Sequence, residues 1–207
     1  MYVPKHFAHE ERGDLIQLVR EFNFGTLVSN VNGAPYATHL PFLISTDENG
    51  NLVLRGHVAK SNPHWKTLEQ GTAMAVFQGP HAYISPTWYN TPGVPTWNYA
   101  AVHLSGVPQL VSDQEQLYNI VITLSEQHEA ANPSPWIPDF PPDMLSAIVG
   151  FTMKVDTIEG KYKLSQNRSA ADKIQVIREL RAPFGQAADE NQSRIAAMME
   201  AVDNNIL

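Results

Sequence analysis

The sequence predicts a mainly β fold with peripheral helices (α+β), organised as a closed or nearly closed β-barrel. About six or seven β-rich segments follow one another with few helices between them, which favours antiparallel strands over regular βαβ alternation. No G-x-G-x-x-G sequence is present, so a nicotinamide-binding Rossmann domain is excluded. The length of 207 residues is typical of one domain with appended helices.

Composition and missing motifs narrow the function classes. Hydrophobic residues make up 43% of the chain and charged residues 17%, as in a soluble globular protein. Cysteine is absent, which excludes disulfides, thiolate nucleophiles and cysteine-ligated metal sites. Walker A, G-x-S-x-G and H-E-x-x-H sequences are also absent, which excludes the common NTPase and hydrolase classes. The chain lacks a membrane-length apolar run and a signal-peptide core, so we expect a cytoplasmic protein without membrane contact.

Local signals place the first helix and the strands. Apolar residues at helical spacing predict a helix that ends before Gly25. Asn32-Gly33 is typical of a two-residue hairpin turn. Runs rich in β-branched, aromatic and small apolar residues predict the strands. These expected strands cover residues 25–29, 35–45, 52–59, 72–78, 81–85, 96–111, 145–158 and 161–165.

Turn and cap signals divide the rest of the chain. Gly79-Pro80 is expected to interrupt a strand, and Glu159-Gly160 to form a turn. Ser112 and Ser169 each open a capping box and therefore predict two further helices. A last amphipathic helix is expected over residues 187–202. We expect residues 1–182 to form one domain and residues 183–207 to be its helical tail.

The stretch Leu52–Gly71 contains a candidate anion site. It is expected to be a strand, a tight turn with Lys60 and Ser61, and one short helix. Asn62 is a favourable N-cap, a proline suits the first helical position, and Gly71 is expected to end the helix in the left-handed conformation. Helix amides, an ammonium and a hydroxyl at one point favour a phosphate. The alternative is a plain turn with a solvated lysine.

Aromatic and amide side chains provide a candidate slot for a flat ring. Aromatic faces cover a heterocycle, and amides such as those of Gln78 and Asn98 meet its edge. The alternative is that the aromatic residues pack in the core or at an interface, and that His81 and His103 are hydrogen-bonded core residues. The candidate aromatic residues are Trp88, Tyr89, Trp97 and Tyr99.

Charge and histidine spacing offer few other partners. The net charge is −7, and residues 67–153 contain no lysine or arginine, so most of the surface would repel a polyanion. The segment Lys154–Arg181 is the candidate basic face, with a solvated helix and hairpin as the alternative. His6 and His9 form an H-x-x-H pair without a third ligand, so no metal site is expected.

Longer strings of residues resemble a known family. They are His39-Leu-Pro-Phe, Gly56-His-Val-Ala-Lys-Ser-Asn-Pro-His-Trp65, Phe77-Gln-Gly-Pro-His-Ala-Tyr-Ile-Ser-Pro86, Val94-Pro-Thr-Trp-Asn-Tyr99 and Lys163-Leu-Ser-Gln-Asn167. They are similar to the PaiB-type family, described as FMN-binding negative transcriptional regulators. That family is related to split-barrel flavoproteins, which include pyridoxamine-phosphate oxidase. The resemblance extends from Met1 to about residue 181, so it covers most of the chain.

The resemblance implies a split β-barrel homodimer that holds FMN at the subunit interface. Lys60, Ser61 and Asn62 would hold the phosphate, and His57 would lie near the ribityl-phosphate end. Thr38, His39 and Leu40 would run past the isoalloxazine edge. The ring pocket would be completed, from either chain, by Gln78, Trp97, Asn98 and Tyr99.

Three functions are compatible with such a protein. The first is an FMN-binding negative transcriptional regulator that acts in transcription repression without essential turnover. The second is a flavin-dependent oxidoreductase acting on a small molecule, and the third is a haem-handling split-barrel protein. No residue is singled out as catalytic, because nothing distinguishes a proton-shuttling histidine from a hydrogen-bonding one. If repression occurs, it would use DNA contacts of the Lys154–Arg181 segment or a protein partner.

Overall fold

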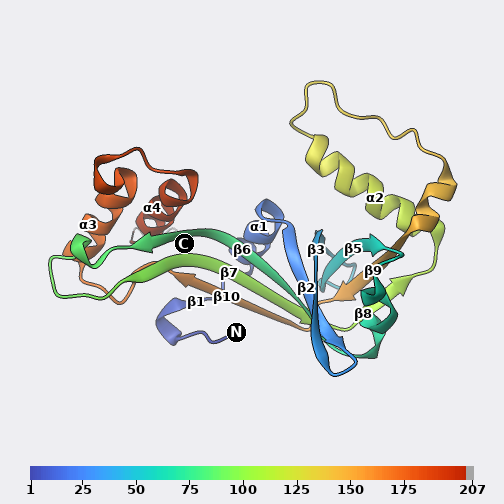
Figure 1. Ribbon diagram of the computed structural model, residues 1–207, viewed down its shortest axis with the longest axis horizontal. Helices are drawn as coiled ribbons and strands as arrows, with labels where there is room; N and C mark the ends of the chain where they lie inside the picture. Colours follow the sequence, from blue (N-terminus) through green and yellow to red (C-terminus); the bar gives the residue numbers. More distant parts are fainter. Residues whose placement is uncertain (204–207) are drawn as a thin grey trace. The chain divides into compact units, whose positions relative to one another are not determined.

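The computed structural model describes residues 1–203, apart from the side chain of residue 142, and contains two antiparallel sheets (Figure 1). The six-stranded sheet has the order β1-β10-β7-β6-β2-β3, and the four-stranded sheet the order β4-β5-β9-β8. The strands are β1 Ala8–His9, β2 Phe24–Val31, β3 Ala34–Pro41, β4 Leu43–Thr46, β5 Leu52–Ala59, β6 Ala73–Ile84, β7 Thr96–Gly106, β8 Pro108–Val111, β9 Ile148–Lys154 and β10 Thr157–Lys163.

Helices lie between some of these strands and follow the last one. The α-helices are α1 Arg12–Glu21, α2 Gln114–Glu129, α3 Ala170–Arg181 and α4 Glu190–Asp203. Short 3₁₀ helices are η1 Lys5–Phe7, η2 Pro63–Gln70, η3 Pro86–Trp88, η4 Pro142–Ala147 and η5 Pro183–Gly185. Across residues 1–203, none of these helices has both the length and the apolar character needed to cross a bilayer.

The chain forms two compact units, and β6 and β7 run from one into the other. One unit, here the site unit, comprises Val19–Phe77 and His103–Ile158. The second, here the terminal unit, comprises Met1–Leu18, Gln78–Val102 and the chain from Glu159 onward. The candidate phosphate turn therefore belongs to the site unit.

The site unit is built around a β-hairpin and a small sheet. β2 and β3 pair with Leu27 opposite Thr38, and the turn between them has left-handed Asn32 and Gly33 (φ 53° and 84°), as expected. β5 pairs with β4 on one side and β9 on the other. Three phenylalanines (Phe42, Phe77 and Phe151) are at most 1% exposed and meet edge to face, so they form the apolar centre of this unit.

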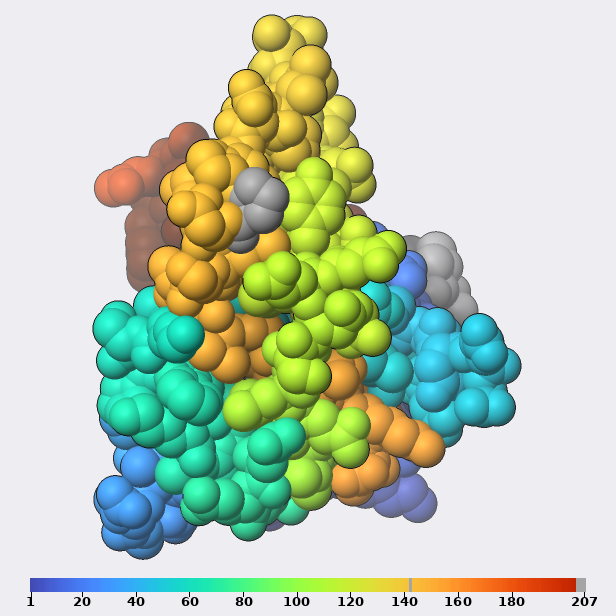
Figure 2. All heavy atoms as spheres, turned by 90° about the vertical axis from the view of Figure 1, so that its right-hand side faces the viewer, coloured from blue at the N-terminus to red at the C-terminus, as the bar shows by residue number. Residues whose placement is uncertain are grey.

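α2 covers one side of the site unit. Leu43 on β4 packs against Ile120 and Leu124 of the helix. A Cβ added at Gly150 would lie 2.7 Å from Leu117 Cδ1, so this glycine lets the helix approach β9 closely. Figure 2 shows the yellow and gold atoms of the later part of α2 and its following loop projecting above the yellow-green atoms of β8.

The terminal unit carries α3 and α4, which pack against each other. Ser169 caps α3 as predicted, because its hydroxyl accepts from the backbone N–H of Asp172 at 3.1 Å. The expected last helix is present as α4. The proposed division at residue 182 stays a prediction, and residues 204–207 of the expected tail lie outside the described residues.

Two expected strands are each divided between the sheets. The prediction of one strand over residues 35–45 is wrong, since β3 ends at Pro41 and β4 begins at Leu43 in the other sheet. The N–H of Phe42 instead bonds to Asn23 O at 2.9 Å. The expected strand over 96–111 likewise ends at Gly106, where an added Cβ would lie 2.1 Å from a backbone oxygen of β9. Long-range pairing, which local propensity does not encode, determines both breaks.

Two glycine signals were also misread. Gly79-Pro80 lies inside the continuous strand β6, and Gly160 lies inside β10. A Cβ at Gly160 would lie 2.3 Å from Leu15 Cδ2, so close packing explains this glycine better than a turn. The N-cap of α2 is Asp113, which accepts from Gln116 N at 3.1 Å, and not Ser112 as predicted.

Candidate functional site

The turn after β5 is held by the side chain of Asn62. Its Oδ1 accepts from the backbone N–H of His64 at 3.0 Å, which confirms the predicted N-cap. Its Nδ2 donates to Thr38 Oγ1 at 3.1 Å, so the cap is tied to β3. The helix that follows is a 3₁₀ helix, and Gly71 ends it in an extended conformation (φ 176°), so the predicted left-handed cap is wrong.

His64 lies beneath this turn and is fully buried. Its Nδ1 is 2.8 Å from Thr38 Oγ1, and its Nε2 is 2.7 Å from Ser29 Oγ. Burial lowers the pKa of His64 below its ordinary value of 6.5, so the ring is neutral near neutral pH. A neutral imidazole donates through one nitrogen and accepts through the other, and two hydroxyls satisfy both. We call Ser29, Thr38, Asn62 and His64 the His64 network.

Sequence reasoning missed this network. His64 was quoted only as part of a family string, and Ser29 was read only as a strand residue. The predicted Asn62 cap was the one sequence signal near this network, because a capped turn indicates an ordered backbone next to His64. Nothing in the local sequence indicates that hydroxyls from β2 and β3 reach that histidine, since the contacts span 35 and 26 residues.

The backbone of the turn is fixed, while two of its side chains remain open. The N–H of Lys60 donates to Ala147 O at 2.8 Å, and its carbonyl accepts from Trp65 Nε1 at 3.0 Å. The side chains of Lys60 and Ser61 are exposed, and no other residue among 1–203 pairs with the ammonium or the hydroxyl. A cation and a hydroxyl on a rigid turn fit one phosphate.

The other site-unit candidates differ in accessibility. His39 is exposed and its Nδ1 lies 2.9 Å from Thr26 Oγ1. Leu40 is 3% exposed and packs onto Gly56, where an added Cβ would lie 2.9 Å from Leu40 Cδ1. Leu40 therefore offers a ligand little of its side chain.

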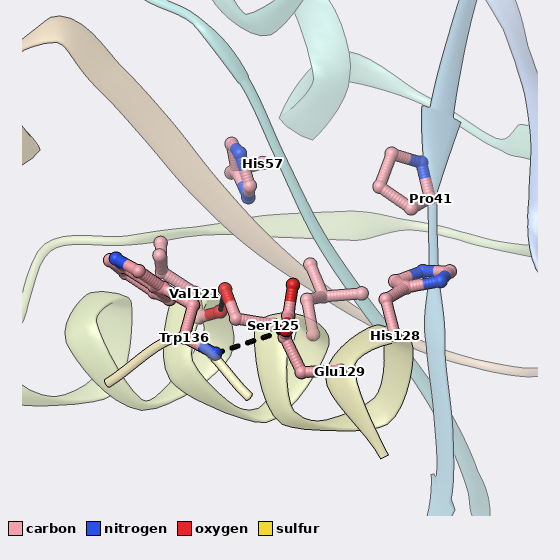
Figure 3. Close-up of a pocket in the computed structure, with 8 residues that line it drawn as sticks. Pro41, His57, Val121, Ser125, His128, Glu129 and Trp136 are labelled. Carbon is pink, nitrogen blue, oxygen red and sulfur yellow. Dashed lines mark hydrogen bonds between the residues drawn. The ribbon is translucent and has the colours of Figure 1, made fainter. Parts of the chain in front are cut away.

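His57 lines a pocket of about 420 Å³ between β3, β5 and α2. Figure 3 shows His57 and Pro41 facing the side of α2 that carries Val121, Ser125 and His128. Burial lowers the pKa of His57 below 6.5, and its Nδ1 is buried without a hydrogen-bond partner among the described residues. The His57 imidazole that lines the pocket is therefore neutral near neutral pH.

The remaining candidates, namely Gln78, Trp97, Asn98 and Tyr99, belong to the terminal unit. Trp97 is 52% exposed and meets Tyr83 edge to face at 6.0 Å. Tyr99 lies 5.4 Å from the Lys161 ammonium, and Asn98 is fully buried. Asn98 Nδ2 donates to Ser165 Oγ at 3.0 Å, so this amide is engaged within the protein.

Two other aromatic candidates pack within the terminal unit. Trp88 is 4% exposed and its ring lies 5.5 Å from that of Phe184. Tyr89 is 9% exposed, and the Arg168 guanidinium lies 4.1 Å from its ring centre. The packing interpretation of these two residues therefore fits their geometry better than the ring slot.

Several cations of the basic segment Lys154–Arg181 are engaged within the protein. Lys161 is 8% exposed and donates to Tyr2 O at 3.0 Å. Lys163 donates to Thr96 Oγ1 at 2.7 Å, and burial together with nearby Lys161 and Arg168 lowers its pKa. Arg181 forms an ion pair with Glu200 at 2.8 Å. These contacts engage three of the seven lysine and arginine side chains of the segment and reduce its capacity to bind a polyanion.

Comparisons with known proteins place the chain in a family. Residues 1–157 match the family model described as "Putative FMN-binding domain". The chain belongs to this family. It is 38% identical to "Protease synthase and sporulation protein PAI 2" of Bacillus subtilis over 206 residues, which cover 97% of each chain. It is also 34% identical to "Uncharacterized protein YKL070W" of Saccharomyces cerevisiae over 157 residues, which cover 64% of this chain and 93% of the yeast protein.

Solved structures support the same fold for this member of the FMN-binding domain family. The flavocytochrome Anf3 of Azotobacter vinelandii superposes with a TM-score of 0.63 at 15% identity, over 78% of this chain and 72% of that one. The "FAD and Heme binding protein" of Mycobacterium smegmatis gives 0.63 at 15% identity, over 81% and 78%. The predicted fold class, mainly β with peripheral helices and of the split-barrel type, is confirmed.

Proposed function

We propose that this protein binds FMN as a homodimer and acts as a negative transcriptional regulator. The family description supports a flavin ligand. The name of the Bacillus subtilis relative, "Protease synthase and sporulation protein PAI 2", supports a role in the control of cellular processes such as sporulation. The observation that carries the cofactor assignment is the rigid turn at Lys60 and Ser61. It offers an open ammonium and an open hydroxyl beside a backbone that the His64 network holds in place.

In this proposal the phosphate of FMN lies against Lys60 and Ser61, and Asn62 positions them. The amide oxygen of Asn62 accepts from His64 N and its amide nitrogen donates to Thr38 Oγ1, so this residue acts mainly on the turn. The one helix amide that Asn62 accepts from is likewise unavailable. The proposed anchor therefore depends on the side chains of the turn more than on the helix N-terminus.

Binding of FMN and riboflavin to the same variants tests the phosphate anchor. In the Lys60→Ala/Ser61→Ala variant we expect FMN affinity to fall by about 10- to 100-fold, because charge-assisted hydrogen bonds contribute about 1.5–3 kcal/mol. Riboflavin lacks the phosphate, so its affinity should not change. Lys66→Ala, on the exposed side of η2, is the matched control. Equal losses for FMN and riboflavin would contradict a phosphate contact.

On the ring side, we propose that His39 of the site unit meets the isoalloxazine, with Thr38, Leu40 and His57 behind it. We propose that Gln78, Trp97 and Tyr99 of the terminal unit, with Asn98 behind them, complete the ring pocket of the other chain in the homodimer. The exposed Trp97 and Tyr83, at 52% and 40%, favour an interface that covers aromatic side chains. Light scattering coupled to size exclusion tests the dimer. A Trp97→Ala variant that stays dimeric and retains full flavin affinity would remove Trp97 from the proposal.

We propose that regulation depends on the flavin-bound protein and a protein partner more than on the basic segment. The support is the engagement of Lys161, Lys163 and Arg181 within the fold. In cells lacking the gene, the wild-type chain should restore repression of its target transcripts, and Lys60→Ala/Ser61→Ala should not. Tight, salt-dependent DNA binding by the purified protein would contradict the protein-partner route.

A further inference from the structure

We infer that the pocket between β5 and α2 is a binding site for a small organic cation with an apolar or aromatic body. The pocket of about 420 Å³ lies wholly in the site unit and has a size typical of small-molecule sites. Its apolar lining comes from Pro41, Val121 and Leu124, and Trp136 borders one end (Figure 3). The inference does not depend on FMN binding.

Glu129 gives the pocket its negative charge. Its Oε2 accepts from Asn132 Nδ2 at 2.6 Å and from the backbone N–H of Trp136 at 3.0 Å. These two bonds, that of Trp136 first, lower the pKa of the Glu129 carboxyl, so it is ionised at neutral pH. Both bonds use the same oxygen. Among residues 1–203 no hydrogen bond reaches Oε1, which is therefore available to a ligand.

The end of α2 adds to this negative potential. Glu129 is the last residue of the 16-residue helix, and the C-terminus of a helix carries a partial negative charge. The lining residues include no lysine or arginine. Arg20 lines a separate pocket of about 310 Å³ with Phe42, Ile44 and Gln127. An anion such as a phosphate would thus meet the Glu129 carboxylate here without a lysine or arginine of the lining to offset it.

The other polar groups of the pocket suit a ligand that donates hydrogen bonds. The Ser125 hydroxyl donates to Val121 O at 2.9 Å, so its oxygen is left to accept. His57 is neutral, because burial lowers its pKa, and can meet a ligand through Nε2. The Trp136 ring is 47% exposed and offers a face for a cation–π contact. An ammonium near Glu129, with its apolar body over Val121 and Leu124, satisfies these groups together.

Glu129 also has a structural role, which a charge-removing variant separates from ligand binding. Glu129 anchors the loop after α2 through its Oε2, and a protein could retain the residue for that reason alone. A Glu129→Gln variant keeps an oxygen that accepts from the loop but removes the charge. Loss of cation preference in a variant with an unchanged loop therefore separates binding from anchoring. Glu126→Gln, on an exposed face of the same helix, removes an equal charge outside the pocket.

Calorimetry with three probes that share a phenylethyl body and differ in charge tests the inference on the full chain. They are 2-phenylethylammonium, 2-phenylethanol and 3-phenylpropionate. We expect the ammonium to bind roughly fivefold or more tightly than the alcohol, because of a charge-assisted hydrogen bond, and the carboxylate not to bind. Glu129→Gln should erase the preference for the ammonium, and Glu126→Gln should keep it.

Two further measurements make the result decisive. Ser125→Phe should fill the pocket and abolish binding of every probe while the thermal midpoint stays near that of the wild type. Lys60→Ala/Ser61→Ala should bind the ammonium as the wild type does, even if FMN binding is lost or was never present. Binding of the carboxylate as tightly as the ammonium, an unchanged preference in Glu129→Gln, or no probe binding at all overturns the inference.

Discussion

Removing one hydroxyl from the His64 network should destabilise the protein measurably. Thr38→Val keeps the shape of the side chain but removes Oγ1, which lies 2.8 Å from His64 Nδ1 and 3.1 Å from Asn62 Nδ2. His64 is fully buried, so water cannot replace the lost partner. A buried polar group without a partner costs about 1–3 kcal/mol, whereas the Asn62 amide, which is only partly buried, can turn to solvent.

We therefore expect Thr38→Val to lower the free energy of unfolding by about 2 kcal/mol. For a chain of this size the thermal midpoint should fall by roughly 4–8 °C. Urea unfolding followed by circular dichroism measures the first quantity, and calorimetry measures the second. FMN affinity should fall as well, because the turn with Lys60 and Ser61 loses its tie to β3.

Thr26→Val is the matched control for this experiment. Thr26 Oγ1 also contacts a histidine ring nitrogen, at 2.9 Å, but His39 is exposed and water can replace the hydroxyl. We expect a change within about 0.5 kcal/mol. If Thr38→Val destabilises the protein no more than Thr26→Val does, the His64 network does not hold the turn, and the account of a rigid phosphate anchor fails.

Two further predictions concern glycines and pH. Gly71→Ala should stabilise the protein by about 0.4–1 kcal/mol, because its φ of 176° suits any residue and nothing lies within 4 Å of an added Cβ. Gly106→Ala should destabilise the protein by more than about 2 kcal/mol, since the added Cβ would lie 2.1 Å from Lys154 O. Equal thermal midpoints for the Gly71→Ala and Gly106→Ala variants would contradict this pair of predictions. The lowered pKa values of His57 and His64 mean that the folded protein binds fewer protons than the unfolded chain below pH 6.5. Their contribution to stability is complete above that pH and declines as the pH falls toward the folded values, so urea unfolding should show lower stability at about pH 5.5 than at about pH 7.5. His57→Gln should flatten this slope, and an unchanged slope would remove His57 as a contributor.

Local chemistry predicted the local features of the fold well. The Asn32-Gly33 turn, the Asn62 cap and the Ser169 cap depend on neighbouring residues and are present as expected. The breaks near residues 42 and 107 were missed, because each follows from strand pairing with a distant segment. A proline at position 41 and the Gly106-Val-Pro108 run were the available signals for these breaks.

In the candidate site, too, features set by neighbouring residues were predictable, and features set by distant contacts were not. The open turn at Lys60 and Ser61 was predictable, because a basic turn before a capped helix is a local pattern. Asn98 was proposed for the ring by its amide, yet it is buried against Ser165, a partner 67 residues away. Lys161 was grouped with a basic face by its position in the sequence, but neighbouring rings and Tyr2 O enclose its ammonium. In both cases the side chain has the predicted chemistry, but its burial against other residues of the protein decides what it can bind.

The residue after Asn62 protects the candidate phosphate turn from one route of chemical ageing. Asparagine ages when the backbone nitrogen of the next residue attacks its side-chain amide, and this reaction leaves a carboxylate in its place. Pro63 follows Asn62 and its nitrogen carries no hydrogen, so that route is closed. The Asn32-Gly33 and Asn49-Gly50 turns keep a backbone N–H and lack this protection. In stored protein, new negative charge would therefore arise at those exposed turns before it reached the residue that orients Lys60 and Ser61.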